Sequence, residues 1–233
     1  MSDMFLLAFG AHPDDVELGA GATCALHAYD GVAICDLTAA ELSSNGDPVT
    51  RQAEAARAAE ELGVAERLCL GLPDRGLSVT PEHIAAIVKV IRQYRPRVVL
   101  APLAQDRHPD HSQCALLVRE AVFSSGLHRY EDGLQPHRPA AFYHYMINGH
   151  ERPTIAVDVS TVYERKMRAL RSYASQFSPA HGVQTPLTSE AFLPMIEGRD
   201  RLFGQAVGCR YAEGLRRDDP AYVGSLRAVL PKS

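Results

Sequence analysis

The chain has 233 residues, of which 46% are hydrophobic and 22% charged, so it is long enough to bury one sizeable globular core. Its net charge is −4 and its Lys and Arg residues are scattered, which argues against a nucleic acid partner. No run reaches the ~18 apolar residues of a membrane-spanning helix. The five cysteines form no CxxC motif, and we expect reduced thiols in a cytoplasmic protein.

Apolar runs alternate with helix-like patterns along the chain. Strands are expected at 4–10, 31–38, 66–72, 97–102, 140–147 and 154–159. Helices are expected at roughly 17–29, 50–62, 81–94, 111–125, 161–173 and 189–206. This alternation predicts βαβ units, and therefore an α/β fold with a mainly parallel sheet covered by helices on both faces. We expect one domain over residues 1–233, with a weakly patterned stretch after about residue 207.

Polar loops follow four of the predicted strands. They read "AHPDD", "TAAELSSNG", "PDRG" and "LAQDRHPDH" in chain order. Because ligands of parallel sheets bind beyond the carboxyl ends of the strands, these loops are expected to form one site at that edge. The first loop contains neither GxGxxG nor GxxxxGK[ST], so the common phosphate-binding motifs are absent there.

Two His-Pro-Asp blocks, "HPDD" at 12–15 and "HPDH" at 108–111, suggest a metal site. His12 and Asp15 are three residues apart and can face one point from the first turn of a helix, and Pro13 suits the start of that turn. With His111 as a remote donor, they make a three-ligand set with an open position, typical of catalytic zinc and also compatible with Fe2+. A single such block would more simply be an acidic helix start, but two at strand ends favour a site.

The same motifs are similar to those of a known family. "AHPDDVELGAGAT" together with "DRHPDH" resembles the LmbE-like, or PIG-L-type, N-acetylglucosaminyl deacetylases. The stretches "ICDLTAAELSSNGDPVTRQAEA", "LGLPDRGL", "AFYHYMING", "KMRALRSYASQF" and "RLFGQAVGCRYAEG" look most like the bacillithiol-biosynthesis branch, which removes acetyl from N-acetylglucosaminyl-malate. The resemblance spans nearly the whole chain.

The resemblance implies a Rossmann-like fold, a homo-oligomer and a role for each site residue. It places zinc on His12, Asp15 and His111. It makes Asp14 the general base, His108 a second catalytic histidine, and Asp110 a carboxylate near that histidine. It puts Arg51 and Arg107 around the sugar and its aglycone.

Several of these residues have simpler interpretations. Ser43, Ser44 and Asn45 either contact sugar hydroxyls or form a turn. Arg51 and Arg107 either pair with a malate carboxylate or make surface ion pairs. Asp110 either orients an imidazole or caps a helix.

The expected reaction is hydrolysis of an acetamide by a zinc-bound water whose pKa the metal lowers to about 7. Asp14 takes the remaining proton, and zinc and a protonated His108 share the negative charge of the intermediate. Either Asp14 or His108 protonates the leaving amine. Competing hypotheses are an amidase for bacillithiol S-conjugates, a deacetylase of another N-acetylglucosamine derivative, and a zinc-dependent sugar-binding protein without turnover.

Overall fold

The structure, a computed structural model, describes residues 4–130, 132–178, 182–225 and 227. Its strands are β1 (Leu6–Gly10), β2 (Val32–Thr38), β3 (Glu66–Leu72), β4 (Val98–Pro102), β5 (Ala141–Tyr145), β6 (Ile155–Asp158) and β7 (Ala212–Arg216). Its helices are α1 (Asp15–Leu26), α2 (Pro48–Leu62), α3 (Pro81–Tyr94), α4 (Pro109–Ser125), α5 (Tyr163–Arg171), α6 (Ala174–Phe177) and α7 (Phe192–Val207). Among the described residues, none of the helices is both apolar and long enough to cross a bilayer.

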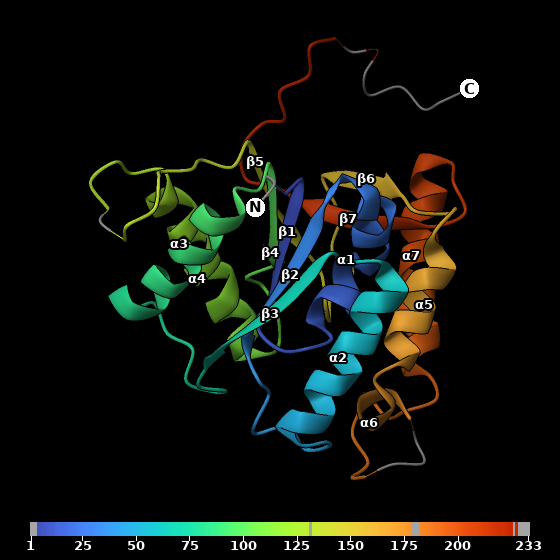
Figure 1. The fold of residues 1–233 in the computed structure, drawn as a ribbon. Coiled ribbons are helices and arrows are strands. Elements are labelled where there is room, and N and C mark those ends of the chain that lie inside the picture. The colour runs from blue at the N-terminus through green and yellow to red at the C-terminus, as the bar shows by residue number, and fades with distance from the viewer. Residues whose placement is uncertain (1–3, 131, 179–181, 226, 228–233) are drawn as a thin grey trace.

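These strands form one sheet in the order β3-β2-β1-β4-β5-β7-β6. The pairs β1–β2, β1–β4, β2–β3 and β4–β5 are parallel, whereas β7 runs antiparallel to both β5 and β6. Helices α3 and α4 cover one face, and α1, α2, α5 and α7 cover the other (Figure 1). The predicted α/β fold with a mainly parallel sheet and helices on both faces is therefore confirmed.

The core has two halves because successive side chains of a strand point to opposite faces of the sheet. In β1, Leu6 and Ala8 pack with α1, α2 and α5, whereas Leu7 and Phe9 pack with α3 and α4. Every residue of β1 is buried, and it lies between β2 and β4 in the sheet. This central position fixes the end of β1, where the "AHPDD" loop begins.

Three helices begin with a polar capping residue followed by proline. Asp47 accepts hydrogen bonds from the backbone N–H groups of Val49 and Thr50 at the start of α2. Thr80 caps α3 and His108 caps α4 in the same way. Proline fits directly after a cap because its fixed φ is helical and its missing N–H is not needed. This pattern places the starts of α2 and α4 two residues before the predicted ones.

Strand β7 is the strand that the sequence pattern did not predict. It has five residues, and its Glu213 and Gly214 interrupt any apolar alternation. Glu213 is nevertheless completely buried. It accepts hydrogen bonds from the backbone of Ala22 and Thr23 in α1, and from the Lys166 ammonium at 2.7 Å. The strand forms because tertiary partners satisfy its charge.

Lys166 is the centre of a buried ionic cluster that joins α5, α7 and β7. Its Nζ lies 2.6 Å from Asp200 Oδ2 and 2.7 Å from Glu213 Oε1, and all three side chains are at most 1% exposed. Tyr163 also donates to Asp200. Removing the cation would leave Glu213 buried without a counter-charge and Asp200 with Arg199 as its remaining cation, which is more costly than losing an exposed ion pair.

We therefore expect Lys166→Met to lower the free energy of unfolding by about 3–5 kcal/mol in urea denaturation. Arg168→Met is the matched control, because Arg168 lies on the same helix and pairs with Glu61 at the surface, where half of its side chain is exposed. That variant should lose less than about 1 kcal/mol. Equal losses in the two variants would contradict the importance of the buried cluster.

Candidate active site

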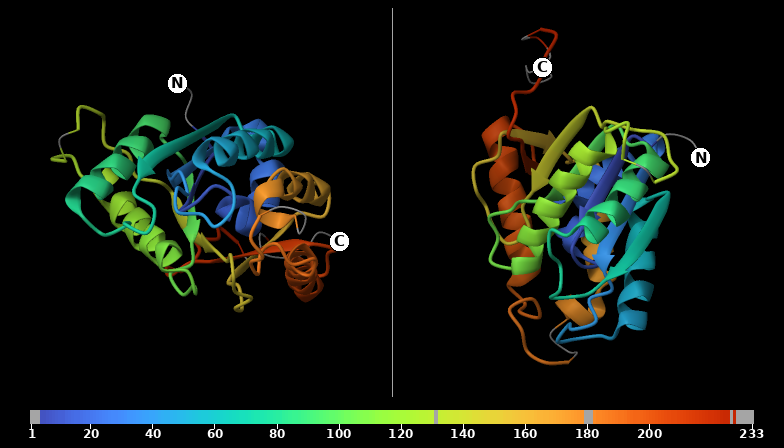
Figure 2. Two further views of the ribbon diagram at one scale, coloured as in Figure 1. Left: turned by 90° about the horizontal axis from the view of Figure 1, so that it is seen from below. Right: turned by 90° about the vertical axis from the view of Figure 1, so that its left-hand side faces the viewer.

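The loops after β1, β2, β3 and β4 meet at one edge of the sheet and line a cavity of about 430 Å³. Figure 2 (left) looks onto this edge from below. The cavity is lined by His12, Asp14, Leu18, Ala40, Leu42, Ser43, Ser44, Asn45, Arg51, Asp74, Arg75, Arg107, His108, His111, Ile147, Asn148, Gln176, Thr185, Leu187 and Phe192. The predicted convergence of the polar loops is therefore present in the structure.

Asp15 lies between the two predicted metal-binding histidines. Its Oδ2 is 3.5 Å from His12 Nδ1, and its Oδ1 is 3.1 Å from His111 Nε2. Asp15 Oδ2 also accepts a hydrogen bond from the backbone N–H of His12, which fixes the carboxylate in the first turn of α1. All three residues are buried, so the tertiary fold brings together the two blocks that are nearly 100 positions apart in the sequence.

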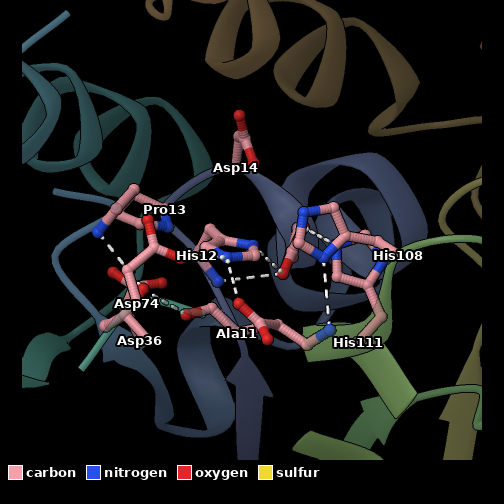
Figure 3. A network of polar contacts seen from close by, with 12 residues as sticks. Ala11, His12, Pro13, Asp14, Asp36, Asp74, His108 and His111 are labelled. Carbon is pink, nitrogen blue, oxygen red and sulfur yellow. Dashed lines mark hydrogen bonds and ion pairs between the residues drawn. The ribbon is translucent and has the colours of Figure 1, made fainter. Parts of the chain in front are cut away.

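Each of these histidines also faces a second carboxylate. His12 Nε2 lies 3.2 Å from Asp74 Oδ1, and His111 Nδ1 lies 3.0 Å from Asp106 Oδ1. Figure 3 shows the His12 and Asp74 side chains pointing toward each other. Carboxylates in such positions set the tautomer and the orientation of a metal-binding imidazole, leaving the opposite ring nitrogen for the metal.

The carboxylates control the charge of the two imidazoles. Burial acts to lower the pKa of His12, but its contacts with Asp110, Asp15 and Asp74 outweigh burial and raise that pKa well above the ordinary value. Burial opposes protonation of His111 in the same way, yet Asp15 and Asp106 raise its pKa to about 9. The site therefore favours positive charge between its carboxylates, which a divalent cation would supply.

Donor atoms for a cation are close enough together. Nitrogen atoms of His12, His108 and His111 lie within 4.8 Å of one another. Asp15 is not part of that group, but its two oxygens each face one of its histidines. A second set, His12 with Asp74 and Asp110, is equally compact and uses the Nε2 side of the His12 ring. The residues fit a metal held by imidazole nitrogen and carboxylate oxygen.

Asp14 stands apart from this cluster. Figure 3 shows its carboxylate directed away from the histidines. Its φ of 116° is a conformation that non-glycine residues rarely adopt, so the backbone turns Asp14 and Asp15 to different sides. Burial raises the pKa of Asp14 to about 7, although Arg51, 3.0 Å from Asp14 Oδ2, acts to lower it. A carboxylate with this pKa is matched to taking a proton near neutral pH.

His108 begins α4, and its Nδ1 accepts the backbone N–H of Asp110. With Nδ1 as an acceptor, the neutral ring carries its proton on Nε2. Burial and the nearby His111 lower the pKa of His108, which favours this neutral form. The protonated His108 expected in the intermediate concerns a later stage of the reaction and stays a prediction. The neutral ring still offers an Nε2–H donor.

Asp110 lies beside an imidazole, as one interpretation of its sequence position expects, and it is not a helix cap. It does not cap α4, because His108 does. The imidazole it faces is that of His12, with 3.5 Å between Asp110 Oδ2 and His12 Nε2, rather than that of His108. Asp110 also accepts from the backbone N–H and the guanidinium of Arg75. Its contacts position His12 and the "PDRG" loop.

The predicted substrate-binding residues have different environments. Arg51 is 2% exposed and donates to the carbonyl of Pro13 as well as to Asp14, so its charge is already used by the candidate base. Arg107 lines the cavity and is exposed. Ser43 lines the cavity, whereas the side-chain amide of Asn45 is bonded to the backbone of Val183.

Comparison with known proteins decides the family. The model of "PIG-L: GlcNAc-PI de-N-acetylase" matches residues 7–122. A diacetylchitobiose deacetylase from Thermococcus kodakarensis is 33% identical, over 91% of this chain and 82% of the relative. The chain belongs to the PIG-L family of deacetylases. Family membership makes it a metal-dependent N-deacetylase, so the hypothesis of sugar binding without turnover is set aside.

Two further relatives support this assignment. A 1D-myo-inositol 2-acetamido-2-deoxy-alpha-D-glucopyranoside deacetylase from Rhodococcus jostii is 28% identical, over 94% of this chain and 98% of the relative. The crystal structure of the conserved protein TT1542 from Thermus thermophilus superposes with a TM-score of 0.87 and 34% identity, covering 95% of this chain and 98% of that one. The similarity thus extends over the whole α/β fold.

Some residues of the site were not predicted from the sequence. Asp106 lies within the quoted "LAQDRHPDH" loop but was not assigned a role, although its partner His111 is five residues away. Asn148 donates to Asp106 from its backbone and its amide. The apolar cavity residues Ile147, Leu187 and Phe192 were not predicted, because isolated apolar residues in separate segments have no distinguishing pattern.

Three further residues, His144, His181 and Glu17, have side chains of the types found in metal sites. His144 lines a different cavity and has its Nδ1 2.9 Å from the carbonyl oxygen of Pro102. His181 lies outside the described residues. Glu17 lies in the first turn of α1, is completely buried and contacts Arg67 and Tyr173, so it belongs to the packing beneath the site.

We expect Asp106→Asn to weaken metal binding about 10- to 100-fold, because the ring of His111 loses its charged partner. The measurement is competition with a chelator of known affinity on the purified protein. Asp47→Asn is the matched control, since it makes the same chemical change at the α2 cap, where Asn serves as well as Asp. Unchanged affinity in Asp106→Asn would show that Asp106 does not position His111.

Proposed function

We propose that the chain is a zinc-dependent hydrolase that removes the acetyl group from N-acetylglucosaminyl-malate, as in bacillithiol biosynthesis. The observation that carries the proposal is the different orientation of two neighbouring carboxylates, Asp14 and Asp15. Asp15 lies among the histidines, and Asp14 faces away from them with a pKa of about 7. Amide hydrolysis requires a metal site and, beside it, a general base that does not bind the metal.

The donor set suggests zinc, held by His12, Asp15 and His111. When bound there, the metal would act as a Lewis acid that makes a water acidic and polarises the acetamide carbonyl. Asp14 accepts the proton of the attacking water. The Nε2–H of His108 donates to the carbonyl oxygen as negative charge develops on it. Asp14 then returns its proton to the departing amine, which leaves the free amino sugar and acetate.

Two arginines in the cavity are suited to binding an anionic aglycone. Arg107 lines the cavity, and its guanidinium contacts no carboxylate among the described residues. Arg75 also lines the cavity, with 47% of its side chain exposed and its Nη1 on Asp110. Guanidinium groups bind carboxylates in a bidentate manner, and malate would present two carboxylates to them.

A neutral glycoside of N-acetylglucosamine is the second candidate substrate. The diacetylchitobiose deacetylase that is 33% identical to this chain acts on such a compound, as its name states. A neutral disaccharide has no carboxylate for Arg107, so the role of that arginine distinguishes the two candidates.

Asp14→Asn is expected to lower kcat by about 10²–10⁴-fold, because the amide cannot take the proton of the attacking water. Zinc content, measured by elemental analysis after dialysis, should stay at the wild-type level, since Asp14 does not face the metal donors. Asp30→Asn, an exposed change outside the cavity, is the control and should retain full activity. An active Asp14→Asn enzyme would refute the assignment of the base.

Acetate release should be measured on N-acetylglucosaminyl-malate, N,N'-diacetylchitobiose and free N-acetylglucosamine, each with and without chelator. We expect the malate conjugate to be the best substrate and the chelator to abolish its turnover. Arg107→Gln should raise KM for the malate conjugate about 10-fold or more through loss of a charge-assisted contact, and leave KM for diacetylchitobiose unchanged. A preference for diacetylchitobiose would instead establish the neutral glycoside as the substrate.

A further inference from the structure

Asn45 joins two separate segments that line the cavity. Its Oδ1 accepts the backbone N–H of Val183 at 2.6 Å, and its Nδ2 donates to the carbonyl of the same residue at 2.9 Å. The side chain thus bonds both polar groups of one distant residue. Asn45 is 7% exposed, and its own carbonyl accepts from the amide of Gln176 at 2.6 Å. The contact between Asn45 and Val183 links the loop after β2 to the segment between α6 and α7.

Gly182 shows how close this contact is. A Cβ at position 182 would overlap the Oδ1 atom of Asn45, so a larger residue cannot occupy this position without moving the contact. Gly182 also has a φ of +70°, a conformation that suits glycine. The segment therefore reaches Asn45 only with glycine at this position. The contact depends on residues 45, 182 and 183 together.

The segment held by Asn45, residues 182–192, provides one wall of the cavity. Thr185, Leu187 and Phe192 line the cavity from this segment. Its far end is fixed by the stacking of Phe192 on Phe177, with ring centroids 5.6 Å apart. None of the three lining side chains titrates, so this wall acts through shape and contact rather than through proton transfer.

The two arginines come from loops of the other helical layer. Arg75 and Arg107 are in the loops that lead from β3 to α3 and from β4 to α4, the helices of one face of the sheet. The segment 182–192 connects α6 to α7, which lie with the helices of the opposite face (Figure 2). An uncharged wall and a cationic wall thus come from different layers of the fold.

We propose that Asn45 is a positioning residue that fixes the segment 182–192 as the wall for the uncharged sugar ring, while the arginines receive the aglycone. This inference rests on the proposed function, because it assumes an amino-sugar substrate. Ligand sites are mostly lined by apolar groups with a few polar contacts, and this wall has that composition. Asn45 therefore determines how the sugar is held without contacting the reacting atoms.

The contact itself is tested by amide hydrogen exchange at Val183. Asn45→Leu keeps the size of the side chain and removes both hydrogen bonds, so exchange at Val183 should become at least about 10-fold faster. Asn45→Asp keeps the acceptor for the Val183 N–H, and exchange there should stay closer to the wild-type rate. Gln184→Leu is the control, because it changes an exposed amide on the same segment and should leave exchange unchanged. Equal exchange in wild type and Asn45→Leu would overturn the proposal.

The role of the wall is tested by steady-state kinetics. Asn45→Leu should raise KM for N-acetylglucosaminyl-malate and for N,N'-diacetylchitobiose by the same factor, about 10-fold, with kcat within about 2-fold of wild type and zinc content unchanged. Arg107→Gln should affect only the malate conjugate. A KM that rises for the malate conjugate alone, or a fall in kcat without a change in KM, would overturn the assignment of the wall to the sugar. If neither compound is deacetylated, the proposed function fails, whereas exchange at Val183 still decides whether Asn45 holds the segment.

Discussion

The site depends on two imidazole rings that are each held between carboxylates. His12 lies between Asp15 and Asp74, and His111 lies between Asp15 and Asp106. The inner carboxylate, Asp15, is shared by both rings, so it ties the start of α1 to the start of α4. The outer carboxylates come from the loops after β3 and β4. The ends of β1, β3 and β4 must therefore be correctly placed relative to one another before either ring is correctly oriented.

The second constraint is the backbone of Asp14. A non-glycine residue at positive φ costs on the order of 1–3 kcal/mol, and such residues concentrate at functional sites where the surroundings stabilise them. Here Arg51 binds both the Asp14 carboxylate and the carbonyl of Pro13. As a result, the adjacent residues Asp14 and Asp15 have different environments and different proposed roles. Burial raises the pKa of Asp14 to about 7, whereas His111 and His12 hold the pKa of Asp15 well below its usual range.

Buried charged residues also connect the site to the helices that pack behind it. Arg199 of α7 donates to the carbonyls of Leu18, Met146 and Ile147, and so connects α1 with the chain that follows β5. The next residue, Asn148, donates to Asp106 beside His111. The Lys166 cluster adjoins Arg199 through Asp200. The helices on this face therefore support the metal donors through ionic and hydrogen-bonded contacts, as well as through apolar packing.

The sequence by itself determined the strand–helix alternation, the parallel sheet and the two His-Pro-Asp blocks, because periodicity and short-range spacing are local properties. It also placed His12, Asp14, Asp15, His108 and His111 at one edge, since the carboxyl ends of parallel strands coincide. Only the tertiary structure decided the partners. Arg51 binds Asp14 rather than standing free for substrate, Asp110 faces His12, and Asn45 holds Val183. These contacts join residues that are up to 138 positions apart, and the formation of β7 likewise depends on a lysine 47 positions earlier. Such pairings follow from how the layers pack, which no local pattern in the chain records.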